Sequence, residues 1–264
     1  MTDQPDPERC EPAAAPLDAE QQMMMKVRVA RLEATLGVAP GRTGLHLPAW
    51  LRPTQGEHRL PVAIALLLIV VLQLKIPDDL AFPPKYLLPL LELLLFAFLS
   101  VASPTRINRE STVLRFAGLT LLGAAGTGTA WSAGRLVYRL AHGQGGTNAM
   151  ALLIHGGEIW LMNVIVFALA YWEFDRGGPA ARANARKNLP DFLFTQMTAP
   201  ELSSRDWEPG IVDYLYLSFT NATAFSPTDT LPLTRWAKLT MMLQSAISLV
   251  VVALVVARAV NIFT

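Results

Sequence analysis

Residues 210–234 read GIVDYLYLSFTNATAFSPTDTLPLT and precede an apolar run that extends to residue 262. The first half of this stretch is apolar and aromatic and contains no proline, which favours a helix. Pro227, Asp229 and Pro232 then interrupt the helical pattern and predict a turn. The stretch therefore predicts a re-entrant half-helix within 210–232, followed by a last membrane helix. An ordinary amphipathic segment that leads into a turn and a membrane helix is the alternative.

The composition is that of a membrane protein. The chain has 264 residues, of which 52% are hydrophobic and 16% charged, whereas about 25% are charged in an average soluble domain. Its net charge of +1 gives no field that would attract nucleic acid. A single cysteine, Cys10, excludes an intrachain disulfide and a cysteine-based metal site. We expect a multi-pass protein of the cell membrane with the lipid bilayer as its partner and without a cofactor.

The order of polar and apolar stretches predicts the domain organisation. Residues 1–58 form a disordered or amphipathic cytoplasmic tail, in which Met25, Val29, Leu32 and Leu36 share one side of a short helix. Residues 59–172 form a four-helix membrane region, 173–209 a polar loop, and 210–264 the half-helix and the last span. The predicted fold class is therefore all-α, an integral membrane bundle of five transmembrane helices plus a re-entrant half-helix. The predicted spans are 60–74, 86–102, 113–140, 149–172 and 235–262.

The distribution of Lys and Arg predicts the orientation in the membrane. Most of these residues lie in the tail, around residues 106–115 and in the polar loop. Fewer lie on the opposite side, namely Lys75, Lys85, Arg135, Arg139 and Arg258. Because basic loops stay in the cytoplasm, this asymmetry indicates a cytoplasmic N-terminus and a cytoplasmic 173–234 segment.

Several polar residues interrupt the apolar helices, and a carboxylate in hydrocarbon needs a partner. In antiparallel helices most of them fall toward the same leaflet, which predicts one polar cluster in which Glu92 or Glu158 pairs with Arg135. The cluster either fixes the register of the helices or handles protons or ions, because His155 can titrate near neutral pH. The motif around His155 lacks the second histidine of a zinc site, so we expect no metal. The predicted members are Gln73, Glu92, Arg135, Arg139, His155, Glu158 and Asn163.

The C-terminal fifty residues or so resemble the pore module of the potassium-channel superfamily. Ser218, Phe219, Thr220 and Thr223 match pore-helix positions, and Asp229 matches the acidic residue that follows the filter. Pro232 falls in the turn, and the inner helix begins at Arg235. The resemblance extends to bacterial integral membrane proteins that share this tail and does not include the first four helices. It implies a homotetramer around a central axis and a monovalent cation as the permeant ion.

The filter segment itself differs from that of a potassium channel. Where the family has Thr-Val-Gly-Tyr-Gly, this chain has Ala-Phe-Ser-Pro-Thr at 224–228. Both glycines are missing, and Pro227 fixes its own φ and restricts Ser226, so a regular stack of carbonyl groups is not expected. The resemblance thus implies a poorly selective or non-conducting pore. Its lining would be Thr220, Thr223, Ala224, Phe225, Ser226, Pro227, Thr228 and Asp229.

Two other classes of function fit the same sequence. A structural or scaffold membrane protein would use the loop as a packed plug and the polar cluster to hold the bundle together. A proton-coupled transporter would use Glu92, His155 and Glu158 to carry protons. We do not expect an enzyme, because no nucleophile and base stand out at a plausible spacing.

Overall fold

The computed structural model describes residues 23–24, 27, 48–102, 106–107, 111–144, 148–187, 189–199, 202–204, 206–223 and 229–263. The chain divides into two units, Met1–Leu47 and Pro48–Thr264. Every element from Ala49 onward belongs to the second unit. The amphipathic residues predicted for the tail, Met25, Val29, Leu32 and Leu36, lie outside the described residues.

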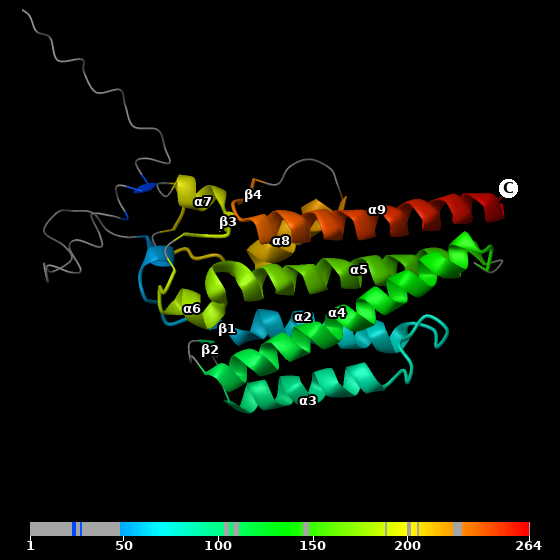
Figure 1. Cartoon of the computed structure of the whole chain (residues 1–264), viewed down its shortest axis with the longest axis horizontal. Coiled ribbons are helices and arrows are strands. Elements are labelled where there is room, and N and C mark those ends of the chain that lie inside the picture. The colour runs from blue at the N-terminus through cyan, green and yellow to red at the C-terminus, as the bar shows by residue number, and fades with distance from the viewer. Residues whose placement is uncertain are drawn as a thin grey trace, which may run out of the picture. The chain divides into compact units, whose positions relative to one another are not determined.

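Helices dominate the second unit, and the longest run alongside one another (Figure 1). This architecture confirms the predicted all-α class, and the helices fall where the apolar runs predicted them. The main helices are α2 (Arg59–Lys75), α3 (Leu87–Ala102), α4 (Thr112–Ala141), α5 (Ala149–Phe174), α8 (Ile211–Thr223) and α9 (Arg235–Phe263).

The short elements gather at one end of the helices, on the left of Figure 1. We call them the cap. They are η1 (Ala49–Leu51), β1 (Glu57–His58), β2 (Arg106–Ile107), η2 (Asp175–Gly177), α6 (Pro179–Ala183), β3 (Phe192–Leu193), α7 (Thr195–Thr198) and β4 (Leu231–Pro232). Strands β1 and β2 pair antiparallel, as do β3 and β4.

The cap corrects two predicted boundaries. The tail was predicted to reach residue 58, but the packed unit begins at Pro48 and buries both Ala49 and Trp50. The segment 173–209, predicted as a polar loop, folds into short elements with buried side chains such as Phe192 and Arg182. Both errors arise because the segments are too short and too polar to show a hydrophobic period.

Helix α5 is the central element, since it packs against α2, α4, α8 and α9. It approaches α9 closely at Gly156, which is buried. A Cβ placed on Gly156 would lie 2.7 Å from Cγ2 of Val255 and 2.9 Å from Cγ1. Gly157, one residue later, is exposed and has no atom within 4 Å of such a Cβ. The crossing of α5 and α9 therefore requires glycine at 156 and not at 157, as in close helix packing between small residues.

Two of the described helices are long and apolar enough to cross a membrane, α5 with the turn after it (Ala149–Gly177) and α9 (Arg235–Ile262). They differ in burial: 56% of the apolar window of α5 is buried in the unit, but only 22% of that of α9. A core helix of a soluble protein would be buried on most sides. Much of the apolar surface of α9 therefore faces outward.

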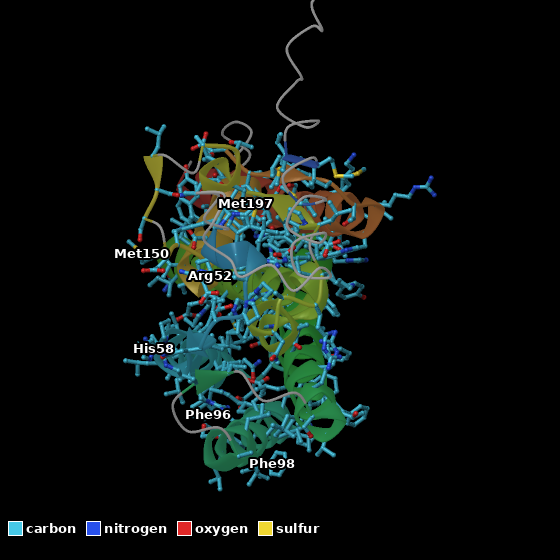
Figure 2. All side chains as sticks on the ribbon, turned by 90° about the vertical axis from the view of Figure 1, so that its left-hand side faces the viewer. Arg52, His58, Phe96, Phe98, Met150 and Met197 are labelled. Atoms are coloured by element: carbon cyan, nitrogen blue, oxygen red, sulfur yellow. The ribbon has the colours of Figure 1, made fainter. Side chains whose placement is uncertain are left out.

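Other helices also expose large apolar side chains. On α3, Leu90, Leu94 and Phe98 are 58%, 61% and 48% exposed and are spaced four residues apart, so they form one stripe. Figure 2, which views the unit from the cap end, places Phe98 at the lower edge, far from Met197 of α7. On α2, Leu60 and Ile64 are exposed in the same way.

We predict that Gly156→Ala destabilises the protein by about 1–3 kcal/mol, the usual cost of inserting a methyl group into a packed site. The rigid, branched Val255 side chain would have to move, and α5 and α9 would separate. Gly157→Ala is the matched control and should be neutral or slightly stabilising because alanine favours helix. Thermal unfolding of the two purified variants in detergent measures the difference, and equal midpoints would contradict the close crossing.

Candidate functional site

Helix α8 begins at the cap. The side chain of Asp213 accepts a hydrogen bond of 2.8 Å from the backbone N–H of Gly210, which caps the start of the helix. The hydroxyl of Tyr214 donates to Asp175 Oδ2 at 2.6 Å, and Asp175 directly follows α5. From there α8 runs between α5 and α9.

The chain returns to the cap after α8. Strand β4 follows the segment 224–230 and pairs with β3, with Leu231 opposite Leu193. The backbone oxygen of Asp229 also accepts a 2.9 Å hydrogen bond from the Thr195 hydroxyl of α7. The segment between β3 and β4 therefore leaves and re-enters at the same end of the helices, and α9 starts from that end (Figure 1).

A buried glutamine of α9 holds α8 in place. Gln244 is completely buried, and its Nε2 donates to Ser218 O at 3.0 Å and to Ser218 Oγ at 2.6 Å. Its Oε1 accepts from Tyr171 of α5 at 2.6 Å and from Asn221 at 2.8 Å. The Ser218 hydroxyl in turn donates to the backbone oxygen of Val164 at 2.6 Å. One side chain thus joins α5, α8 and α9 with its hydrogen-bonding capacity filled.

The end of α8 is capped by side chains. The last carbonyl groups of a helix have no partner within it. Here the Thr223 hydroxyl donates to Thr220 O at 3.0 Å, and the Ser245 hydroxyl of α9 donates to Asn221 O at 3.1 Å. Asn221 Nδ2 also donates to Met241 O at 2.9 Å. These bonds let the helix stop beside α9 without reaching the far end of the unit.

The predicted pore residues divide into three groups. The hydroxyls of Thr220 and Thr223 donate to carbonyl groups of α8 itself. Asp229 is exposed, near β4. The remaining members lie outside the described residues, namely Ala224, Phe225, Ser226, Pro227 and Thr228.

The predicted polar cluster is brought together only in part. Gln73 Nε2 donates to Glu92 Oε1 at 2.9 Å, and both residues are buried between α2 and α3. Gly128 of α4 makes room for them, since a Cβ there would lie 3.0 Å from Gln73 Nε2. The opposite oxygens, Gln73 Oε1 and Glu92 Oε2, are buried without a hydrogen-bond partner.

The other predicted members lie apart from this pair, so the predicted pairing of Arg135 with Glu92 or Glu158 is wrong. Arg135 instead donates from Nε to the backbone oxygen of Asp79 at 3.3 Å. Asp79, which lies in the turn between α2 and α3, also forms an ion pair with Arg139 of α4. Helix depth can be counted along the sequence, but the direction in which α4 presents its arginines depends on packing.

The three predicted polar residues of α5 do not share one partner either. His155 Nδ1 lies 2.9 Å from Glu158 Oε2, one turn along the same helix. Asn163 Nδ2 donates to Ser248 Oγ of α9 at 3.1 Å. Within the described part of the chain, no group of three His, Cys, Asp or Glu residues could hold a metal ion.

A buried ionic cluster in the cap was not predicted. Arg182 is 5% exposed and donates to Glu57 Oε1 at 2.7 Å, to Trp172 O at 2.5 Å and to Asp175 O at 3.0 Å. Burial lowers the pKa of the Arg182 guanidinium, but Tyr214, Glu57 and Asp175 outweigh this effect and leave the pKa above its usual value. The cluster ties β1 to the end of α5 and the start of α8.

We predict that Gln244→Leu destabilises the protein by about 1–3 kcal/mol for each buried group that it leaves unpaired, with the Tyr171 hydroxyl the first of them. Gln144 is an exposed amide at the end of α4. Gln144→Leu is therefore the matched control and should change stability by less than about 0.5 kcal/mol. Chemical unfolding in detergent measures both, and a Gln244→Leu protein as stable as the control would contradict the anchoring role.

For the cap we predict that Arg182→Gln costs about 3–5 kcal/mol, because it leaves the half-buried Glu57 without its ion-pair partner and the buried Asp175 without a nearby cation. Arg186, in the same segment, is exposed. Arg186→Gln should cost at most about 1 kcal/mol, as exposed charges usually do. A fluorescence-detected melting curve for each variant provides the measurement. Similar losses for the two variants would show that burial of Arg182 is not what stabilises the cap.

Comparison with known proteins adds no relative to this geometry. No family model, no curated protein and no solved structure matches the chain. The resemblance of the C-terminal segment to potassium-channel pore modules therefore stays a prediction from the residues quoted for it.

Proposed function

We propose that this chain is a multi-pass integral membrane protein in which α2, α3, α4, α5 and α9 cross the bilayer. The outward apolar surfaces of α9, α3 and α2 support this, because soluble proteins rarely expose apolar patches larger than a few hundred Å². The shortest of these helices, α3, has 16 residues and would extend about 24 Å, near the short limit for a hydrocarbon core of about 30 Å.

Within that membrane protein, α5, α8 and α9 form a pore-type module. The observation that carries this proposal is the course of α8, which starts at the cap and ends beside the first third of α9, after which β4 lies at the cap again. Pore modules likewise hold a half-helix between two full-length helices.

The proposed activity is passage of a monovalent cation, poorly selective or blocked in the resting protein. One chain supplies one half-helix, so several copies, a homotetramer in the pore-module arrangement, would surround the axis. The absence of glycine from 224–228 argues against a potassium-selective stack of carbonyls. Asp229, exposed at the exit of this segment, would supply the negative charge that attracts the cation.

A scaffold protein is the second candidate, and one observation favours it. The hydroxyls of Thr220 and Thr223 donate back into α8, and Gln244 fills its hydrogen bonds within the module. These contacts suit a packed plug as well as a pore wall. A proton-coupled transporter has less support, because the polar residues of α2 to α5 form separate local pairs instead of a connected path.

The test is cation flux into liposomes that contain the purified full-length chain. We predict a measurable flux of K⁺ and Na⁺ that falls about five-fold in Asp229→Asn, since an opposite charge about 4 Å away contributes about 1 kcal/mol in water. Asp206 is an exposed carboxylate in the same region, with 83% of its side chain accessible. Asp206→Asn is the matched control and should leave the flux unchanged.

Three other results would separate the alternatives. A flux no greater than that of protein-free liposomes would favour the scaffold. Uptake that depends on pH, fails in Glu92→Gln and survives in Asp229→Asn would favour the transporter. A monomer in native mass spectrometry would contradict the oligomeric pore.

A further inference from the structure

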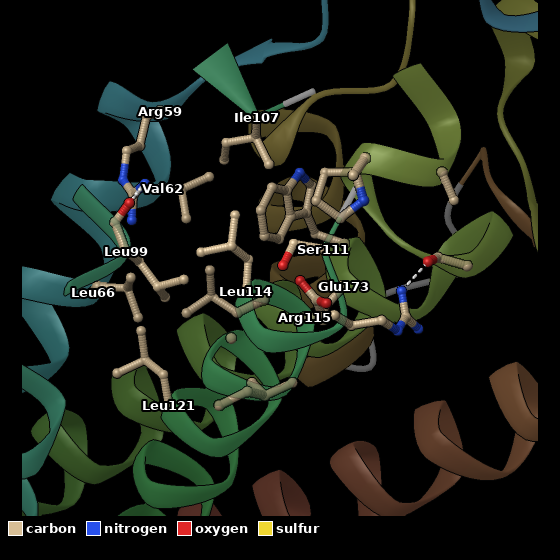
Figure 3. Close-up of a pocket in the computed structure, with 18 of the residues that line it drawn as sticks. Arg59, Val62, Leu66, Leu99, Ile107, Ser111, Leu114, Arg115, Leu121 and Glu173 are labelled. Carbon is tan, nitrogen blue, oxygen red and sulfur yellow. Dashed lines mark hydrogen bonds between the residues drawn. The ribbon is translucent and has the colours of Figure 1, made fainter. Parts of the chain in front are cut away.

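A cavity of about 690 Å³ lies beside the proposed pore module and shares with it the last turns of α5 (Figure 3). Its walls come from α2, α3, α4, the end of α5, α6 and the turn that joins α5 to α6. Binding sites for small molecules usually enclose about 300–1,000 Å³, so the cavity is large enough for a ligand. None of the hydrogen bonds that anchor α8 to Gln244 involves its walls.

The interior of the cavity is apolar. Side chains of Val62, Leu66, Leu99, Leu114 and Leu121 face it from three different helices (Figure 3). Val62, Leu66 and Leu121 are at most 9% exposed, so this wall lies deep between the helices. An apolar lining of this kind suits a hydrocarbon chain, since burying hydrocarbon there is favourable by about 0.8 kcal/mol per CH₂ group.

The rim of the cavity is cationic. Arg115, Arg186 and Lys187 are exposed and line it at the cap end, and Arg59 lines it from α2. Arg115 donates a hydrogen bond to the backbone oxygen of Gly177, which holds its guanidinium at the rim (Figure 3). Among the described lining residues, Glu173 is the acidic one, whereas several are basic. Positive charge therefore exceeds negative charge at the rim.

The start of α4 adds to this positive rim. Ser111, the N-cap residue of the 30-residue helix, lines the cavity, and its side chain makes no capping hydrogen bond. Helix N-termini carry unsatisfied N–H groups and a partial positive charge that favours anions. A ligand in the cavity would therefore have its anionic group near Ser111 and Arg115 and its apolar part near Leu66 and Leu121.

We propose that this cavity binds one anionic phospholipid. Its phosphate lies at the cationic rim and an acyl chain passes between α2, α3 and α4. The inference rests on the membrane location proposed above and not on ion conduction. Charge complementarity favours a lipid with a negative headgroup over a zwitterionic one. Basic pockets between membrane helices on the cytoplasmic side suit such headgroups, and the basic cap indicates that same side.

The experiment is titration of the full-length protein in detergent with phosphatidylglycerol, phosphatidylcholine or inorganic phosphate, followed by thermal shift and native mass spectrometry. We expect saturable stabilisation by phosphatidylglycerol and little by the other two. Lys187→Gln should weaken that binding about five-fold, the equivalent of about 1 kcal/mol for one basic residue near an anionic lipid. Lys238, exposed on α9 at the same end, does not line the cavity, so Lys238→Gln is the matched control.

A second variant tests the apolar part. Leu114→Phe inserts a larger side chain into the cavity and should weaken phosphatidylglycerol binding while the lipid-free protein keeps its melting temperature. The proposal is overturned if phosphatidylcholine binds equally well, or if Lys187→Gln and Lys238→Gln behave alike. It is also overturned if inorganic phosphate saturates the same site and displaces the lipid, because the site would then take a soluble anion. Liposome flux is not needed for any of these outcomes, so failure here is distinguishable from failure of the pore proposal.

Discussion

A helix that ends between packed helices must find hydrogen-bond partners for its last carbonyl groups, and the contacts of α8 with α9 are arranged around this constraint. In water such groups would be solvated, but in hydrocarbon each unsatisfied one costs several kcal/mol. Helix α8 meets the requirement with Thr223 from its own last turn and Ser245 from α9. Gln244 then fixes α8 along its length. Without these side chains, Thr220 O and Asn221 O at the end of α8 would lose these hydrogen bonds.

The sequence allowed much of the fold to be predicted because apolar runs and proline positions report helices directly. The predicted spans at 60–74 and 86–102 agree with α2 and α3 to within about a residue at each end. The contacts between helices were harder to predict. Gln73 and Glu92 do meet, because the turn after α2 brings α2 and α3 together as neighbours. Arg135 points instead to the turn at Asp79, which depends on the rotation of α4 about its axis, and a single sequence does not specify that rotation.

The cap shows a different limit. Its central residue is Arg182, and arginine is almost never fully buried without a partner. The polar segment around Arg182 was therefore predicted to be an exposed loop. Its ion-pair partner Glu57 comes from a distant position in the chain, 125 residues away. Gln244 had a clearer signal, since it is an amide within a long apolar helix, where a polar side chain needs a partner. Its partners on α8 became clear only once the course of that helix was known.

The cap also bears on the direction of the proposed pore. Helix α8 starts at the cap end of the unit, which has more cations than the opposite end. Those at the cap end include Arg59, Arg106, Arg115, Arg176, Arg182, Arg186, Lys187, Arg235 and Lys238. If these cations mark the cytoplasmic side, α8 enters from the cytoplasm, while the half-helix of a potassium channel enters from outside. The filter segment lacks the glycines that an outward-facing selectivity filter needs, so sequence and orientation depart from the channel pattern together. Both departures follow if the proposed half-helix enters from the cytoplasmic face. A segment on that face would not need the glycines of a potassium-selective filter.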